Sequence, residues 1–253
     1  MSSSAARSVL AVGSGKGGVG KSTVTLQLAL ACARRGLRVG VLDADLYGPD
    51  IPLMVGISRQ EQARQWHLWR RGGTSLEPIE RHGLALMSVG FLLAENQALT
   101  MAAPLLTAAL RQLVLEVEWG ELDLLLVDLP PGTADLQQQL VDVVRLDGAV
   151  VVVGPQDVAH LDARKFVVFL RDAGVPVLGG IENMSGLVCP HCGEMIEVFA
   201  PAAEERAVWA EGVPLLGRVP LDPRLGAEPA EPQPVFDPVA ERLLEALRRR
   251  PAA

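Results

Sequence analysis

Two of the three lysines in this 253-residue chain lie five positions apart in a glycine-rich segment. The chain otherwise uses arginine, so lysine is kept where a compact ammonium group on a flexible stem is needed. Residues 15–22 match the phosphate-binding pattern GxxxxGK[ST], whose glycines let backbone N–H groups surround a phosphate. Lys21 is then expected to neutralise β- and γ-phosphate charge, and the Ser22 hydroxyl to ligate Mg²⁺. The candidate nucleotide-binding residues of this loop are Gly15, Lys16, Gly17, Gly18, Val19, Gly20, Lys21, Ser22 and Thr23.

Three aspartates stand directly after apolar runs and could serve a bound nucleotide. Leu124–Val127 leads into Asp128, the arrangement of a carboxylate that holds Mg²⁺ directly or through water. Asp43 and Asp45 follow another such run; we assign Asp45 to orienting the attacking water and Asp43 to the outer shell of the metal. Gly132, in Pro131-Gly132, could donate a backbone N–H near the γ-phosphate. The alternative for any of these aspartates is a simple helix cap.

A second kind of chemistry is indicated by Cys189-Pro190-His191-Cys192, because two cysteines two residues apart have metal-ligand spacing. The remaining cysteine, Cys32, is expected to be a small buried hydrophobe. Two thiols are half of a four-ligand site, and a symmetric dimer would supply the other half. By spacing alone, zinc and an iron–sulfur cluster fit equally well, and a redox pair is a third option.

The elements that must position these residues are apolar runs separated by helical patterns. Strands with few polar positions, alternating with helices, predict an α/β fold: a mostly parallel, doubly wound sheet with helices on both faces. The expected strands cover 8–12, 37–42, 84–89, 122–127, 149–153, 177–181 and 215–219, and the expected helices cover 21–35, 104–117, 159–173 and 241–250. The glycine loop, Asp43, Asp128 and Asn183 all follow strands, so we expect them to meet at one sheet edge.

The length of the chain predicts one domain over residues 1–253, with two interruptions. Residues 58–83 are polar and are expected to be a surface excursion, whose Trp66 and Trp69 pack on the domain or mark a partner surface. Residues 226–238 contain four prolines and are expected to connect to the last helix.

Composition narrows the classes of protein that the chain could be. Hydrophobic residues make up 49% and charged residues 21%, enough for a large core. A net charge of −7 argues against broad nucleic-acid binding. No apolar run is long enough to span a membrane, the first residues lack a signal peptide, and the cysteines do not form a secreted framework. We therefore expect a cytoplasmic protein with neither a nucleic-acid nor a membrane partner.

The motifs together resemble one family, the Mrp-type or cytosolic iron–sulfur carrier P-loop ATPases. The resemblance runs in order through SGKGGVGKST (14–23), VGVLDADLYGPDIP (39–52), WGELDLLLVDLPPGTAD (119–135), PQDVA (155–159), GGIENMSGLVCPHCG (179–193) and GVPLLGRVPLDP (212–223). It implies a homodimer, or alternatively a heterodimer, that bridges a [4Fe–4S] cluster through paired CxxC motifs and passes it to apoproteins. It also implies ATP binding with slow hydrolysis coupled to cluster loading or transfer.

Further residue roles rest on the same resemblance. GKGGVGKST is similar to the deviant phosphate loop of the MinD, ParA and nitrogenase-iron-protein class, in which the first lysine, here Lys16, reaches the partner's nucleotide. Asn183 matches the position that contacts adenine, and Pro220 and Asp222 are expected to line the base. The chain departs from the family at Asp50, where serine is usual, at Ala134, where glycine is usual, and at Met101–Pro104, where an arginine is lost.

Two other functions remain open at this point. A ParA/MinD-like positioning ATPase would share the Lys16 loop but needs a membrane helix or a basic DNA-binding surface. A P-loop ATPase dimer with a purely structural zinc would share the CxxC pair, and zinc could occupy the thiols in isolated protein.

Overall fold

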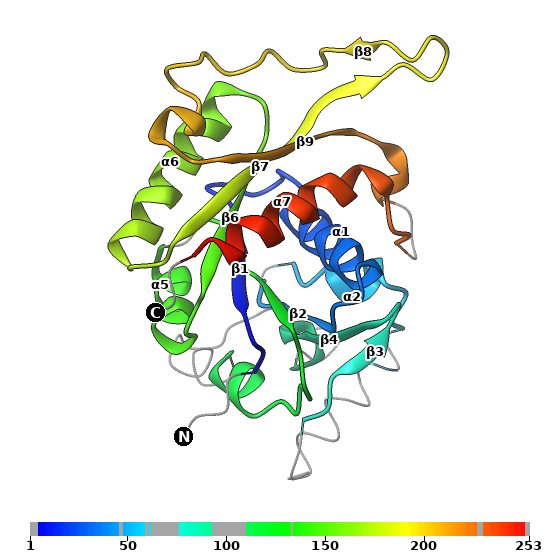
Figure 1. Ribbon diagram of the computed structural model, residues 1–253, viewed down its shortest axis with the longest axis vertical. Coiled ribbons are helices and arrows are strands. Elements are labelled where there is room, and N and C mark those ends of the chain that lie inside the picture. The colour runs from blue at the N-terminus through cyan, green and yellow to red at the C-terminus, as the bar shows by residue number, and fades with distance from the viewer. Residues whose placement is uncertain are drawn as a thin grey trace.

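The nine strands of the computed structural model form one sheet at the centre of the molecule (Figure 1). The structure describes residues 5–45, 48–58, 61, 76–92, 110–132, 134–226 and 230–250. The strands are β1 (Val9–Gly13), β2 (Val39–Asp43), β3 (Ile79–Arg81), β4 (Leu84–Ser88), β5 (Leu124–Asp128), β6 (Gly148–Val153), β7 (Val177–Val188), β8 (Met195–Ile196) and β9 (Leu215–Leu221). Their order is β3-β4-β2-β5-β1-β6-β7-β8, with β9 also paired to β7.

The central strands are parallel, and each of β1, β2, β5 and β6 is buried along its whole length. Burial on both faces explains why these strands are apolar along their length, apart from the terminal Asp43 and Asp128, rather than at alternate positions. Among the described strands, only β3 on β4 and β8 on β7 pair in the antiparallel direction. The predicted α/β class and mostly parallel sheet are therefore confirmed.

Helices cover the two faces of this sheet. They are α1 (Lys21–Arg34), α2 (Ile51–Met54), α5 (Ala134–Val143), α6 (Asp157–Asp172) and α7 (Asp237–Arg248), and residues 110–115 are also helical. In the strand order, β2 lies on one side of β1, whereas β7 lies on the other side of β6. The connections β1–α1–β2 and β6–α6–β7 therefore run in opposite directions along the sheet. Right-handed connections therefore place α1 and α6 on opposite faces.

Several boundaries differ from those expected. β7 continues to Val188, well beyond the predicted end at Ile181, because its outer half pairs with β8 and β9. β3 makes residues 79–81 of the predicted excursion an edge strand. α7 begins at Asp237, inside the predicted connector, because Pro238 is well tolerated in the first helical turn, where no N–H is needed. α5 was not predicted from the sequence. Met101–Pro104, Trp66 and Trp69 lie outside the described residues.

Among the described residues, no helix is long and apolar enough to cross a membrane.

Candidate functional site

The phosphate loop joins β1 to α1, and its glycines are required by close packing. A Cβ atom at Gly15 would lie 2.2 Å from the backbone of Asp162 in α6. Gly20 has a φ of 79°, and a Cβ there would lie 2.3 Å from the Asn183 side-chain nitrogen. A larger residue at either position would therefore displace the loop.

The loop encloses a pocket of ≈ 190 Å³. Its lining residues are Ser14, Lys16, Gly17, Gly18, Gly20, Lys21, Ser22, Thr23, Asp45, Asp50, Met54 and Pro131. Most of the predicted loop residues thus face one pocket. Val19 is buried instead, and its carbonyl oxygen accepts a hydrogen bond of 2.9 Å from Asn183 Nδ2.

Asp128 is completely buried beneath this pocket and is held by three donors. Its Oδ2 accepts hydrogen bonds from Lys21 Nζ at 2.8 Å and Ser22 Oγ at 2.6 Å, while its Oδ1 accepts one from Thr25 Oγ1 at 2.7 Å. Thr25 was not among the residues predicted from the sequence. Its position four residues after Lys21, one helical turn further along the same face, was the available signal.

Lys21 is buried between two carboxylates. Its ammonium group lies 2.8 Å from Asp128 and 3.4 Å from Asp45. Burial lowers the pKa of Lys21, but the carboxylates outweigh this and leave its pKa above the usual value. The side chain is therefore a fixed positive charge in the pocket, suited to a phosphate.

Asp43 lies beside Asp128 because the two residues are directly paired in the β2–β5 register. Burial, together with the neighbouring Asp128 charge, raises the pKa of Asp43 well above its usual range. The Asp45 backbone N–H and the Ser88 hydroxyl each donate a hydrogen bond of 3.1 Å to its carboxylate. Two adjacent buried carboxylates with one lysine leave excess negative charge, which a divalent cation would neutralise.

The two remaining residues at the edge of the pocket differ in their surroundings. Lys16 is half-buried and lines the pocket, and no described residue forms an ion pair or hydrogen bond with its ammonium group. Gly132 is exposed beside the pocket-lining Pro131 and has a φ of 64°, which explains the glycine.

The cysteine motif lies on a projecting hairpin, residues 185–200, which we call the arm (Figure 1). The Cys189 N–H donates a 2.8 Å bond to the Glu194 carbonyl, and the Gly193 N–H donates a 2.9 Å bond to the Cys189 carbonyl. Backbone N–H groups of Cys192 and His191 lower the pKa of Cys189. The turn is therefore arranged to stabilise a thiolate, the form that binds metals.

Within the described part of the chain, the two thiols have no further ligands. Both are free, Cys189 half-buried and Cys192 exposed. In the described part of the chain, no group of three or more His, Cys, Asp or Glu side chains is arranged to hold a metal ion. Cys32 is buried in α1, as expected, and burial raises its pKa to about 11, so it is a poor ligand.

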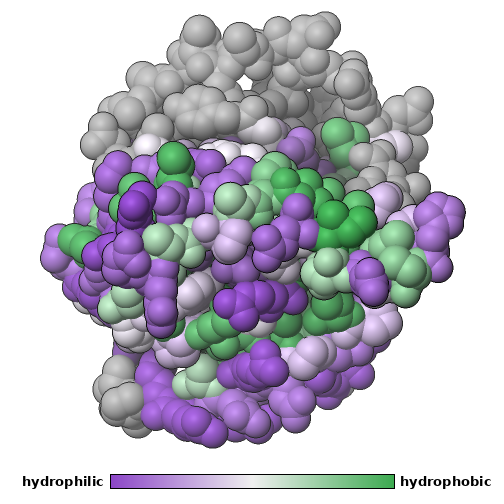
Figure 2. All heavy atoms as spheres, turned by 90° about the horizontal axis from the view of Figure 1, so that it is seen from above, coloured by the Kyte–Doolittle hydropathy of each residue, from purple (hydrophilic) through white to green (hydrophobic). Residues whose placement is uncertain are grey.

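The arm also exposes apolar side chains, and Figure 2 views the molecule from that side, with hydrophobic residues in green among polar ones. The exposed residues of the arm are Val188, Met195, Ile196, Val198 and Phe199, and Leu221 of the adjacent β9 is exposed as well. Such a concentration of apolar surface is typical of an interaction face.

Pro220 and Asp222 lie outside the phosphate pocket. They line a groove of ≈ 610 Å³ together with Cys189 and Pro190, so the structure brings them to the arm. The Asp222 carboxylate is bound by Arg224 at 2.6 Å.

Asn183 connects these regions through β7. It is buried beneath the phosphate loop, six residues before Cys189. The next residue, Met184, has a φ of 60°, which is unusual for a residue other than glycine, and the β7–β9 register shifts between Asn183 and Leu187.

Comparisons with known proteins point to one family. The family model described as ParA, NUBPL iron-transfer P-loop NTPase, matches residues 5–248. The chain is 43% identical over 215 residues to the iron-sulfur cluster carrier protein of Escherichia coli K12, covering 85% of this chain and 57% of that protein. The chain thus spans little more than half of that relative. It is 45% identical to the bovine cytosolic Fe-S cluster assembly factor NUBP2, covering 87% of this chain and 81% of that one.

Solved structures agree on the fold. A nucleotide-binding protein from Archaeoglobus fulgidus, in complex with ADP, matches with a TM-score of 0.72 and 31% identity, over 98% of this chain and 90% of that one. The cell division ATPase MinD of Pyrococcus furiosus matches with a TM-score of 0.68 at 21% identity, over 94% of this chain and 98% of that one.

Proposed function

The chain belongs to the iron-transfer branch of the ParA-type P-loop NTPases, and we propose that it is an ATP-dependent carrier of iron–sulfur clusters. The observation that supports this most directly is the arm, which presents Cys189 and Cys192 outside the body of the domain. A carrier must expose its cargo, because the thiols of an acceptor have to reach the metal.

The cargo is a [4Fe–4S] cluster bound by two copies of the chain. One chain offers two thiols at suitable spacing, while a four-thiolate site needs four. Two arms meeting on a two-fold axis would supply Cys189 and Cys192 twice. The apolar side chains that surround the motif support this arrangement, because dimer contact would remove them from water.

Nucleotide binding is assigned to the phosphate loop. Lys21 and the loop N–H groups hold the phosphates, and Lys16, whose ammonium group has no described partner, reaches the nucleotide of the second protomer. Ser22 and Asp128 would hold Mg²⁺, with Asp43 in its outer shell, and the metal would neutralise developing phosphate charge. Binding requires Ser22 and Lys21 to exchange their bonds with Asp128 for bonds to the incoming groups.

Hydrolysis is assigned to water held by Asp45, which lines the pocket, with the Gly132 N–H near the γ-phosphate. Asn183, Pro220 and Asp222 are assigned to the base, Asn183 from beneath the loop and the other two from the groove that also contains Cys189. We infer slow turnover that is coupled to the arm through β7, because the same strand braces the loop and leads to Cys189.

Anaerobic reconstitution tests this function. We expect about four iron and four acid-labile sulfide per dimer, followed by transfer to an apo-acceptor at a rate that changes with ATP. Zinc at one per dimer, with no sulfide and no transfer, would instead establish the structural-zinc alternative. Nucleotide-dependent binding to DNA or to lipid vesicles, without a cluster, would establish the positioning-ATPase alternative.

A further inference from the structure

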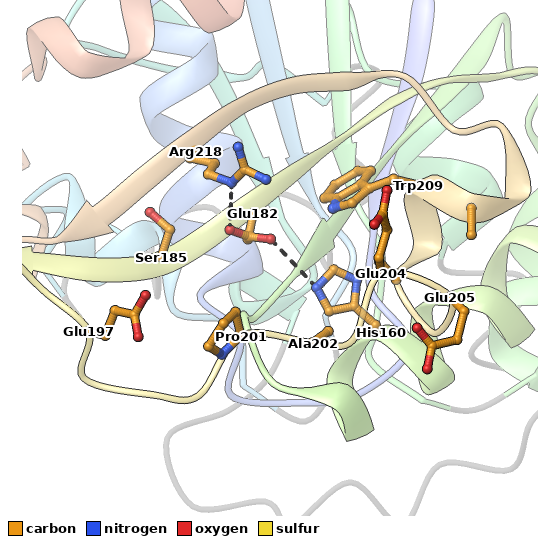
Figure 3. A pocket seen from close by; sticks show the side chains of 12 residues that line it. His160, Glu182, Ser185, Glu197, Pro201, Ala202, Glu204, Glu205, Trp209 and Arg218 are labelled. Atoms are coloured by element: carbon orange, nitrogen blue, oxygen red, sulfur yellow. Dashed lines mark hydrogen bonds and ion pairs between the residues drawn. The ribbon is translucent and has the colours of Figure 1, made fainter.

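A cavity of ≈ 800 Å³ lies at the base of the arm, away from the phosphate pocket (Figure 3). Both sides of the hairpin that forms the arm line this cavity, through Ser185 and Glu197. The other lining residues belong to α6, β7, β9 and the segment around Trp209. None of the roles assigned above uses this cavity.

Its floor is a row of three polar side chains, Arg218, Glu182 and His160. Arg218 Nε donates a 2.9 Å hydrogen bond to Glu182 Oε1, so these two charges neutralise each other. The other carboxylate oxygen, Oε2, lies 3.6 Å from His160 Nε2. This distance is within ion-pair range but is too long for a hydrogen bond.

His160 is consequently left with an unsatisfied donor. Its ring is 1% exposed, and its Nδ1 accepts a hydrogen bond of 3.1 Å from the Val208 N–H. The neutral ring therefore carries its proton on Nε2. That atom is buried without a hydrogen-bond partner, which is costly in a folded protein unless something binds nearby.

The walls carry unpaired negative charge and an aromatic ring. Glu197 lies at one end of the cavity in Figure 3, and Glu204 and Glu205 lie at the other. No described residue forms an ion pair or side-chain hydrogen bond with any of these three carboxylates. The half-buried Trp209 ring lies beside Glu204 in Figure 3, edge-on to His160 at 5.7 Å between ring centres.

We propose that this cavity docks a polypeptide segment of a partner protein through an arginine or lysine side chain. Three carboxylates that have no ion-pair partner among the described residues, in a cavity that is also lined by an indole, suit a cation, because charge attraction and cation–π attraction act together. A polypeptide also brings backbone carbonyl oxygens, which can accept the His160 Nε2 proton when the Glu182 carboxylate that faces it at 3.6 Å turns aside, whereas a small cation such as a polyamine brings no acceptor. Because both sides of the arm line the cavity, a segment bound here would lie against the hairpin that carries Cys189 and Cys192.

If the carrier function holds, docking at this cavity would select the acceptor protein. Selection of the acceptor is the one part of the proposal that rests on the proposed function. Binding itself does not require a cluster. The double variant Cys189→Ser/Cys192→Ser should therefore bind the segment with unchanged affinity, which separates a failure of the docking site from a failure of the carrier function.

The test is an NMR titration of the full chain with the peptide acetyl-GRGRG-amide, following the Trp209 indole N–H. We expect saturable shifts at that signal, and an affinity reduced about tenfold by Glu197→Gln/Glu204→Gln/Glu205→Gln. The matched control is Glu80→Gln/Glu116→Gln/Glu118→Gln, which removes the same charge from exposed positions that do not line the cavity and should leave the affinity unchanged.

Two further outcomes bear on the proposal. Trp209→Leu should weaken binding, although Trp209 packs on Gly180, so the glutamate variants provide the test that does not disturb the core. Equal loss of affinity in both glutamate triple variants would mean non-specific charge attraction, and equally tight binding of spermidine would mean a simple cation site. Either result would overturn the proposal.

Discussion

At the scale of single residues, the phosphate pocket is organised by Lys21. Its ammonium group lies between Asp128 and Asp45, and Asp43 lies next to Asp128 in the sheet register. Lys21 therefore neutralises part of the negative charge of these carboxylates. A bound nucleotide and its metal would take over that neutralisation, which gives each of these residues a distinct expected phenotype.

Lys21→Ala should reduce MgATP affinity on the order of a hundredfold, because a buried charged contact to phosphate is lost. Lys16→Ala should leave affinity near that of the wild type but lower turnover, since its proposed target is the partner's nucleotide. Calorimetry and phosphate release measure the two effects. Unchanged affinity in Lys21→Ala would contradict the phosphate-loop assignment, and normal turnover in Lys16→Ala would contradict the shared site.

Asp45→Asn should slow hydrolysis while ATP remains bound, because the residue is assigned to the attacking water. Asp128→Asn should instead shift the Mg²⁺ dependence of turnover to higher concentration, because its carboxylate is assigned to the metal. The measurement is the rate of phosphate release as a function of Mg²⁺. If the two variants exchanged phenotypes, the assignment of roles would be wrong.

Asp43 predicts a pH dependence of stability. Burial raises its pKa in the folded state, so the folded protein binds this proton more tightly than the unfolded chain does. The contribution of this bound proton to the stability of the folded protein is fully present below the ordinary aspartate pKa of 3.8. It is lost as pH rises through the raised pKa of Asp43 in the folded state. In nucleotide-free protein, Asp43→Asn should therefore flatten the fall of Tm with increasing pH.

The control for that measurement is Asp123→Asn. Hydrogen bonds from Arg38 lower the pKa of Asp123 to about 2. The stabilising effect of the ionised Asp123 carboxylate is therefore already complete above the ordinary aspartate pKa of 3.8. This variant should lower Tm by a constant amount across the same range. A slope that stayed at the wild-type value in Asp43→Asn would show that Asp43 is not the titrating group.

At the scale of elements, β7 runs from the phosphate loop to the arm and is the proposed connection between the nucleotide and the thiols. Asn183 braces the Val19 carbonyl, Met184 adopts a left-handed conformation, and the arm begins directly afterwards. A non-glycine residue in that conformation costs about 1 kcal/mol or more, and such strain is common where a chain must change direction for function. We infer that Met184 fixes the angle between the arm and the sheet.

Met184→Gly should leave ATP affinity and cluster content intact while reducing the effect of ATP on the rate of cluster transfer. Glycine removes the constraint on φ and lets the arm move independently of the loop. His82→Gly is the matched control, because His82 also has a positive φ, 52°, but lies in the turn between β3 and β4. Equal nucleotide effects in wild type and Met184→Gly would exclude β7 as the coupling element.

At the scale of the whole molecule, the proposed nucleotide and metal sites use different residues of one chain, and under the proposed function a second copy would complete both. Lys16 has no described partner within its own chain, and Cys189 with Cys192 forms half of a ligand set. The exposed apolar side chains of the arm favour the same association. Dimer formation and cluster binding should therefore be linked.

Cys189→Ser and Cys192→Ser should each remove the cluster while preserving ATP affinity, and Cys32→Ser should preserve both. Iron and sulfide analysis, together with calorimetry, measures these effects. Ile196→Glu/Phe199→Glu should also lower cluster content, because charge at the arm surface opposes dimer contact; sedimentation at several concentrations would show it. A full cluster in a monomeric variant would contradict the bridging arrangement.

The sequence by itself determined the local chemistry. Glycine spacing, lysine placement and apolar strands running into aspartates predicted the parallel sheet and most of the phosphate pocket, because these features depend on a few neighbouring residues and on a regular period. The bulk of the resemblance to the iron–sulfur carriers also lay in such short motifs.

What the tertiary structure decided involves residues far apart in the chain. The pairing of Asp43 with Asp128, the bond from Thr25 to Asp128, and the bracing of the loop by Asn183 all depend on how strands and helices pack. The extension of β7, the groove shared by Cys189 and Pro220, and the cavity around His160 likewise require several elements at once. Sequence periodicity describes which face of an element is buried, whereas these contacts depend on what the buried face meets.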